Sequence, residues 1–415
     1  MNLSKKTQKN ICPIPAFYIH IPFCRTLCPF CTFAVRRDRA NMHEKYIQGI
    51  VDEIVRRSEM LTVMEPKEGD EKHLRQVSLE SIYFGGGTPS CFTIQEVSVL
   101  IKKVREYFPC SDQIEIAFEM NPDDVNPEYL SGLAEIGVNR LSLGGQSFQT
   151  STLQQLERCH TSADLREAIA SITDSLFVNW NLDLMFGIPE QSFSMFKKDV
   201  EEALAYDPTH ISLYGLEIHE RTPFGKNPQI LRWVSEHQEQ FEAMYLWATD
   251  RLEKAGLFQY ELSNFSKKDY EGRNNLLVWS GQEYLGLGVG AHSYYMQTRW
   301  GNTRSIRTYL QHLEKNKMPT EFEERLSGKQ LAAEFLMLGL RQCKGINIEE
   351  WQTRFGLQWQ KQHTEFVQGL CDEGRAFWKG QRLCLSPKGM LLADRITLQL
   401  MPELSEDLLS RQYYS

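Results

Sequence analysis

Residues 80–119 have the sequence ESIYFGGGTPSCFTIQEVSVLIKKVREYFPCSDQIEIAFE, and this stretch contains the pattern that decides the fold. Two short apolar runs, 80–84 and 114–119, are suited to buried strands. Between them, residues 94–107 have apolar side chains at helical spacing. Two strands joined by such a helix pair in parallel, with a right-handed crossover. The stretch therefore predicts one βαβ unit of a parallel sheet.

The same alternation continues on both sides of this unit. Further strand candidates are 16–21, 139–143, 177–186 and 210–216, and further helix candidates are 42–60, 127–136, 163–175 and 192–205. Strand–helix alternation repeated about six times is typical of an α/β fold built on a parallel sheet. Periodicity leaves open whether this sheet is an open one or an incomplete barrel.

The remaining segments follow a different pattern. The charged stretch 62–79 is expected to be a solvated connection, 234–256 a long helix, and 258–265 a strand that precedes a glycine-rich stretch at 284–295. From about residue 320, helix candidates at 328–341, 348–354 and 358–372 lead to two extended pieces, 375–380 and 382–386, and a last helix at 387–399. This C-terminal pattern fits either a small winged-helix unit or a packing domain that covers one end of the sheet.

Composition excludes several classes of protein. The 415 residues suggest two or three packing units, and 41% hydrophobic content excludes wholesale disorder. With 46 basic and 54 acidic residues the net charge is −8, which argues against a nucleic-acid-binding protein that relies on a basic surface. No apolar run approaches the ~20 residues of a membrane span. The polar start MNLSKKTQKN is not followed by a signal-peptide core, so a cytoplasmic location is expected.

Three of the ten cysteines, Cys24, Cys28 and Cys31, are packed into the octapeptide CRTLCPFC just after the first predicted strand. In a reducing compartment such a group indicates a metal or cluster site rather than disulfides. Three thiolates can bind three irons of a [4Fe–4S] cluster and leave the fourth iron open to a ligand. The alternative is a zinc site completed by His20 or His43.

The residues around these cysteines point to a family. CxxxCxxC with an aromatic residue, Phe30, before the last cysteine resembles the signature of radical S-adenosylmethionine (radical SAM) proteins. Together with YIHIPFC (18–24), FGGGTPS (84–90), NLDLMFGIPEQ (181–191), ELSNF (261–265) and GLGVGAHSY (286–294), it resembles the coproporphyrinogen III dehydrogenase-like family. That family contains oxygen-independent coproporphyrinogen oxidases and HemW-type heme chaperones. The resemblance runs from about residue 17 to 290 and returns at 334–346.

This resemblance implies an architecture and two cofactors. The fold would be an incomplete parallel (βα)6-type radical SAM barrel with a C-terminal, helix-rich, winged-helix-like domain. The implied segments are an N-terminal extension (1–15), the radical SAM core (16–225), an extension with the SNF and GAHSY motifs (226–320) and the C-terminal domain (321–415). Cys24, Cys28 and Cys31 would bind a [4Fe–4S] cluster. One-electron reduction of S-adenosylmethionine (SAM) would break its carbon–sulfur bond and give methionine and a 5′-deoxyadenosyl radical.

Several polar or glycine positions near strand ends are candidates for contacts with SAM. The glycines of FGGGTPS allow a ligand to approach the backbone, although the stretch alone also fits a tight turn; it lacks the Lys-Ser/Thr of a phosphate-binding loop. Glu119 and Asp183 place carboxylates in apolar strands, which is costly without a partner, so each fits either a ligand contact or a structural ion pair. By resemblance the full set of SAM contacts is Tyr18, Gly86, Gly87, Thr88, Glu119, Gln146, Arg158 and Asp183.

Two departures from the family patterns bear on function. The dehydrogenases carry a fourth cysteine two places after the third, where this chain has Phe33, and this favours the heme-chaperone branch. That branch carries an HNxxYW motif tied to heme binding, whereas the aligned residues here are NNLLVW (274–279), so the histidine is replaced by Asn274. His292 is then a candidate heme ligand or, alternatively, a scaffold residue.

The preferred hypothesis is therefore a chaperone that binds heme and passes it to an accepting protein. The alternatives are a coproporphyrinogen III dehydrogenase, which would bind a porphyrinogen, another radical reaction on a tetrapyrrole, and a cluster protein whose radical chemistry has been lost. Expected partners are SAM, heme or a porphyrinogen, an electron donor such as a flavodoxin or ferredoxin, and a heme-accepting protein. No nucleic acid is expected.

Overall fold

The computed structural model describes residues 14–63 and 78–401 of the chain. Its centre is a run of six parallel strands in one sheet, each joined to the next through one or more helices. The strands are β1 (Ala16–Ile21), β4 (Leu79–Gly86), β5 (Cys110–Met120), β6 (Arg140–Gln146), β7 (Trp180–Phe186) and β8 (His210–Gly215). The helices are α1 (His43–Val63), α2 (Ile94–Tyr107), α3 (Pro127–Glu135), α4 (Thr150–Gln155), α5 (Ser162–Thr173) and α6 (Phe193–Ala205). This confirms the expected α/β fold with a parallel sheet.

Further strands extend this parallel array at both edges. On one side β1 pairs in parallel with β11 (Tyr284–Leu287), and β12 (His292–Tyr295), β13 (Thr298–Asn302) and β14 (Thr320–Arg325) follow antiparallel. On the other side β8 pairs with β10 (Asn264–Ser266), which pairs with β9 (Phe258–Gln259). The outermost strands of this 12-stranded sheet, β14 and β9, are not hydrogen-bonded to each other in the described part of the chain, as an incomplete barrel requires.

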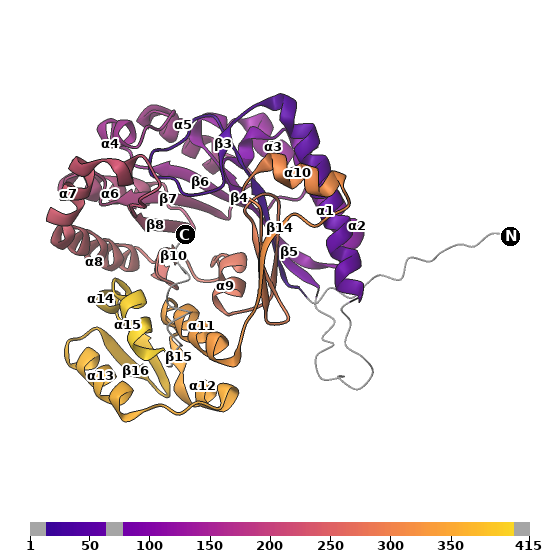
Figure 1. Ribbon diagram of the computed structural model, residues 1–415. Coiled ribbons are helices and arrows are strands. Elements are labelled where there is room, and N and C mark those ends of the chain that lie inside the picture. The colour runs from indigo at the N-terminus through magenta and orange to yellow at the C-terminus, as the bar shows by residue number, and fades with distance from the viewer. Residues whose placement is uncertain (1–13, 64–77, 402–415) are drawn as a thin grey trace.

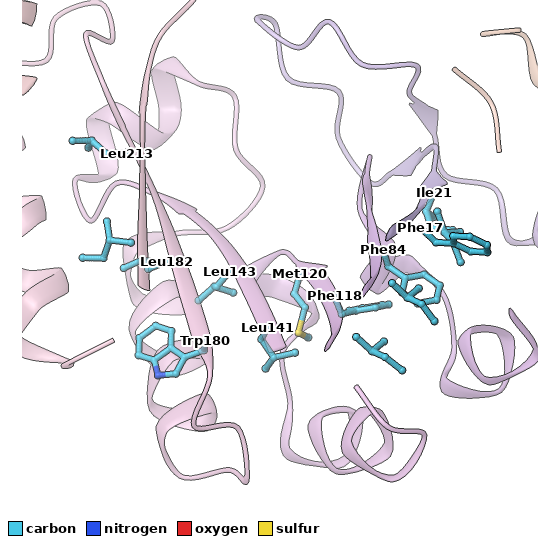
Figure 2. Packing of buried hydrophobic residues seen from close by; sticks show 14 of the residues in the cluster. Phe17, Ile21, Phe84, Phe118, Met120, Leu141, Leu143, Trp180, Leu182 and Leu213 are labelled. Atoms are coloured by element: carbon cyan, nitrogen blue, oxygen red, sulfur yellow. The ribbon is translucent and has the colours of Figure 1, made fainter. Parts of the chain in front are cut away.

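Figure 1 shows helices such as α1, α2, α5, α6 and α8 (Gln238–Lys254) on the outer side of the curved sheet. The strands are buried on both faces, as expected for a parallel sheet covered by helices. Phe17, Phe84, Phe118, Leu143 and Leu182 are all fully buried. Figure 2 shows them following one another across neighbouring strands. This shared core fixes the register of the strand ends, where the candidate site lies.

The C-terminal elements form a separate lobe, drawn in orange and yellow in Figure 1. Its sheet has three strands in the order β15, β17, β16, of which the sequence predicted two. The lobe contains α11 (Gly328–Leu340), β15 (Ile346–Asn347), α12 (Ile348–Phe355), α13 (Lys361–Asp372), β16 (Ala376–Lys379), β17 (Arg382–Leu385), α14 (Pro387–Met390) and α15 (Ala393–Leu400). A helix-rich C-terminal region is therefore confirmed.

Two expected elements are wrong in detail. The helix expected at 234–256 is two helices, α7 (Pro228–Glu236) and α8, since His237 leaves the helical path and its Nδ1 contacts the Trp233 carbonyl at 2.7 Å. The start of α7 carries a signal that was overlooked: Asn227 caps the helix and Pro228 occupies its first turn. The strand expected at 258–265 is instead a hairpin, because the chain turns at 261–263 and Phe265 pairs back with Gln259.

The domain boundaries remain a proposal. The segment 226–320 also contributes α9 (Arg273–Trp279) and α10 (Ile306–Glu314), and its strands lie at both edges of the main sheet; β14 crosses the boundary expected at 320/321. The extension 1–15 and the connection 62–79 fall largely outside the described residues. Among residues 14–63 and 78–401, none of the helices combines the length and hydropathy needed to cross a lipid bilayer.

Candidate functional site

A cavity of about 460 Å³ opens at the carboxyl ends of the parallel strands. Ligands commonly bind at this edge of α/β sheets and barrels because loops from several strands converge there. The volume is typical of small-molecule sites. Ten of the eleven predicted site residues line it: Cys24, Cys28, Cys31, Gly86, Gly87, Thr88, Glu119, Gln146, Arg158 and Asp183.

The three cysteines lie on the loop that follows β1. Cys24 ends the short strand β2 (Phe23–Cys24), and the amide of Cys31 donates to the carbonyl of Cys28 at 3.2 Å, so the loop turns and brings the thiols to one cavity. All three are free thiols. Burial raises the pKa of Cys24 to about 12, a hydrogen bond with Thr88 opposes that rise, and burial also raises the pKa of Cys31. Such thiols need cationic partners before they can ionise here.

Both histidines that could have completed a zinc site have other partners. His20 Nδ1 pairs with the Tyr18 hydroxyl at 2.9 Å, and His20 Nε2 pairs with the Ala34 carbonyl at 3.0 Å. His43 contacts the carboxylates of Asp38 at 2.7 Å and Glu96 at 3.4 Å. Neither imidazole is therefore directed to the cysteines. Within the ranges that the structure describes, no three His, Cys, Asp or Glu side chains have the geometry of a single metal-ion site.

The glycine-rich turn after β4 lies directly against the cysteine loop. The amide of Gly87 donates to the carbonyl of Ile21 at 2.7 Å, and the amide of Thr88 donates to that of Phe23 at 2.8 Å. A Cβ atom on Gly87 would lie 2.8 Å from both carbonyl oxygens and 2.9 Å from Cys24 Sγ. Glycine is therefore required here because the two loops approach so closely.

Two carboxyl groups line the cavity from strands on either side of β6, Glu119 from β5 and Asp183 from β7. Glu119 Oε1 accepts from the Tyr83 hydroxyl at 2.7 Å, and Glu119 Oε2 accepts from the Gly86 amide at 3.2 Å. Burial raises the pKa of Glu119 to about 7 and that of Asp183 to about 6. Asp183 Oδ1 accepts a hydrogen bond from Asn181 Nδ2 at 2.7 Å. No structural ion pair holds either group in the described part of the chain, so both favour a cationic ligand.

Arg158 is the cationic side chain of the cavity. It lies in the turn after α4 rather than on a helix, and its Nη1 approaches Cys28 Sγ at 3.6 Å. Its Nη2 donates to Asn121 Oδ1 at 2.7 Å and to the Gly144 carbonyl at 3.0 Å. Asn121 also donates to Thr88 Oγ1 at 3.3 Å, so it connects Arg158 to the glycine-rich turn.

Sequence reasoning missed Asn121, although the signal was available. It directly follows the carboxyl end of a buried strand, and Gln146, which was predicted, ends the next strand in the same way. Other cavity-lining residues that were not predicted are Ser142, Met185, Tyr214, Glu217, His219 and Ser263. These come from strand ends and loops that the chain brings together only on folding.

Tyr18 is the one predicted residue that does not line the first cavity. It lines a second cavity, of about 380 Å³, together with Thr32, Phe33, Asn274 and His292. Its ring stacks on Tyr83 with centroids 6.2 Å apart, and Tyr83 in turn donates to Glu119. Any effect of Tyr18 on the first cavity is therefore expected to pass through Tyr83.

The raised pKa values predict a pH-dependent stability. A carboxyl whose folded pKa lies above its unfolded value contributes stability that is complete below the unfolded pKa and lost as pH rises through the folded one. For Glu119 this window runs from 4.5 to about 7, so the melting temperature of the ligand-free chain should fall as pH rises across it. Glu119→Gln should flatten the profile of melting temperature against pH. Glu167→Gln, on the exposed side of α5, should leave it unchanged; equal profiles for both variants would contradict the prediction.

Family models match two parts of the chain. Residues 18–203 match the model described as the radical SAM superfamily, and residues 326–392 match the HemN C-terminal domain. Among curated relatives, the heme chaperone HemW of Bacillus subtilis is 30% identical over 388 residues, covering 93% of this chain and 99% of that protein. The heme chaperone HemW of Synechocystis is 32% identical over 410 residues, covering 94% and 97%.

Among solved structures, coproporphyrinogen III oxidase (HemN) from Escherichia coli, described as a radical SAM enzyme, superposes with a TM-score of 0.75 at 19% identity. The match covers 95% of this chain and 92% of that one. At this identity the likeness establishes a shared fold, which includes the C-terminal lobe as well as the main sheet.

Proposed function

Because the chain belongs to the HemW family of the radical SAM superfamily, we propose that it binds heme and delivers it to a partner protein. The observation that carries this proposal is the similarity to proteins named heme chaperone HemW along 93–94% of the chain. Phe33 supports it, since the dehydrogenase pattern requires cysteine at that position.

Radical SAM proteins use a [4Fe–4S] cluster and SAM, and the residues of the first cavity fit both. Three free thiols line it, so we assign Cys24, Cys28 and Cys31 as the cluster ligands. When bound, cluster and SAM supply one-electron chemistry that these side chains cannot perform. The protein's own part is to bring the thiols to one cavity, and the hydrogen bonds of Gly87 and Thr88 to the carbonyls of Ile21 and Phe23 fix the start of the cysteine loop.

The charges of the cavity fit SAM, which carries a sulfonium, an ammonium and a carboxylate group. We assign the Glu119 and Asp183 carboxyls to the cationic part and the Arg158 guanidinium to the carboxylate. The assignment of Gly86, Gly87, Thr88 and Gln146 as further contacts rests on their place around the same cavity. Tyr18 would support Glu119 through Tyr83. An electron donor such as a flavodoxin or ferredoxin, and a heme-accepting protein, complete the proposed system.

Two assays on the anaerobically purified chain separate chaperone from dehydrogenase. Titration with ferric heme should shift the Soret band and saturate at a defined ratio of heme to protein. Incubation with coproporphyrinogen III, SAM and a reductant should yield no protoporphyrinogen IX. Formation of protoporphyrinogen IX would establish the dehydrogenase instead, and a Soret band unchanged by the protein would contradict heme binding.

A further inference from the structure

The second cavity adjoins the first along the loop that carries the cysteines. Thr32 and Phe33 of this loop line both cavities, and the wall opposite them is built from α9 and from the β11–β12 region. A volume of about 380 Å³ lies within the range of cavities that hold small ligands. A ligand here would therefore lie beside the proposed cluster without occupying the space assigned to SAM.

His292, the first residue of β12, presents an imidazole to this cavity. Neither of its ring nitrogens has a hydrogen-bond partner among residues 14–63 and 78–401, and its side chain is exposed. By contrast, His20 lines the same cavity with both ring nitrogens engaged, by Tyr18 and Ala34.

Neighbouring residues hold this imidazole in place. His292 pairs with Gly301 across the β12–β13 ladder, and a Cβ on Gly301 would lie only 2.4 Å from the ring of Phe322. The missing side chain thus makes room for Phe322, whose ring meets that of His292 edge-on with centroids 5.3 Å apart. Because Phe322 packs against it, the His292 imidazole is already positioned to act as a ligand of iron. Its ring nitrogens would lose no hydrogen bond on binding the metal.

The rest of the cavity suits a flat, apolar molecule that carries acidic groups. Phe33 is 61% exposed, which is unusual for a large aromatic residue and provides a face for stacking. Val278 and Tyr284 add further apolar surface. Arg304 anchors the loop by donating from Nη2 to the Thr32 carbonyl. Its other N–H groups have no hydrogen-bond partner within the described part of the chain, so they can pair with a carboxylate in this cavity.

We propose that the second cavity is the heme site of this protein, in which His292 would bind the iron, Phe33 would pack against the apolar part of heme and Arg304 would pair with one of its carboxylates. This inference rests on the proposed function, since it assigns a place to the heme that the chain binds. It also places the heme directly beside the loop of the cluster ligands, so occupancy of one site can affect the other.

The test compares the heme spectra of two histidine variants in the full-length chain. His292→Ala should change the Soret position and the EPR signal of the ferric heme and weaken its binding at least tenfold. His237→Ala, at the junction of α7 and α8 and in the lining of neither cavity, should leave both spectra unchanged. Unchanged spectra in His292→Ala, or changed spectra in His237→Ala instead, would overturn the assignment of His292.

A rescue experiment protects this test against misfolding. His292→Gly should regain the spectrum of a histidine-bound heme when free imidazole is added, and should gain nothing from it if His292 is not a ligand. Metal-free protoporphyrin should bind His292→Ala and the natural chain equally, because it offers no iron to ligate. If the natural chain itself binds no heme, the proposed function fails; if it binds heme without any change in the variants, only the site assignment fails.

Discussion

Replacement of Cys24, Cys28 and Cys31 together by alanine is expected to lower bound iron from about four atoms per chain to almost none after anaerobic reconstitution with iron and sulfide. The three thiols line one cavity and are free to bind metal. Iron and sulfide analysis, with the absorption of the cluster near 400 nm, measures the loss.

The matched control is a second triple variant, in which Cys91, Cys110 and Cys159 are replaced by alanine. These are also free thiols, and Cys91 lies close to the cysteine loop, with its Sγ 3.9 Å from the Phe23 carbonyl. The control should keep about four irons. If both triple variants keep their iron, or if the natural chain retains zinc in place of iron, the cluster does not reside on this loop.

Local sequence patterns predicted the central part of the fold closely. The strand 16–21 and the helix 94–107 have the predicted bounds. The observed strand β4 runs past the predicted end at 84, because Gly85 and Gly86 continue the sheet although glycine carries no strand signal. The six-residue helix α4 was missed, since one and a half turns leave too short a pattern.

What the sequence could not predict is pairing over long distances. β1 pairs with β11, which brings Ala16 opposite Tyr284, and no local pattern specifies such a contact. That pairing places β12 and His292 beside the cysteine loop and thereby creates the second cavity. Cysteine spacing and strand-end positions predicted which residues gather in the first cavity, whereas Asn121 and the separate place of Tyr18 needed the structure. Their roles as ligands remain predictions.

Gly86→Ala, in the glycine-rich turn, is expected to lower both the stability of the protein and its affinity for SAM. Gly86 has φ +111°, a conformation that L side chains rarely adopt, and a Cβ there would lie 2.4 Å from the ring of His20. His20 cannot move aside freely, since it is buried and bonded to Tyr18 and Ala34. Backbone strain and overpacking each cost about 1–3 kcal/mol, so the free energy of unfolding should fall by several kcal/mol.

The same substitution should also weaken SAM binding, because relief of the clash must shift either the turn or His20, and the Gly86 amide would then lose its hydrogen bond to Glu119. Urea unfolding measures the stability. Equilibrium dialysis with SAM, without urea and at a temperature where the variant is fully folded, should show at least a tenfold rise in Kd.

Gly369→Ala is the control: this exposed position in α13 has no atom within 4 Å of the added Cβ. Alanine there should raise stability by about 0.5–1 kcal/mol through helix propensity and leave SAM binding unchanged. If Gly86→Ala leaves both stability and SAM affinity as this control does, the close packing around Gly86 does not constrain the backbone there. The assignment of this glycine-rich turn to the SAM site would then be wrong.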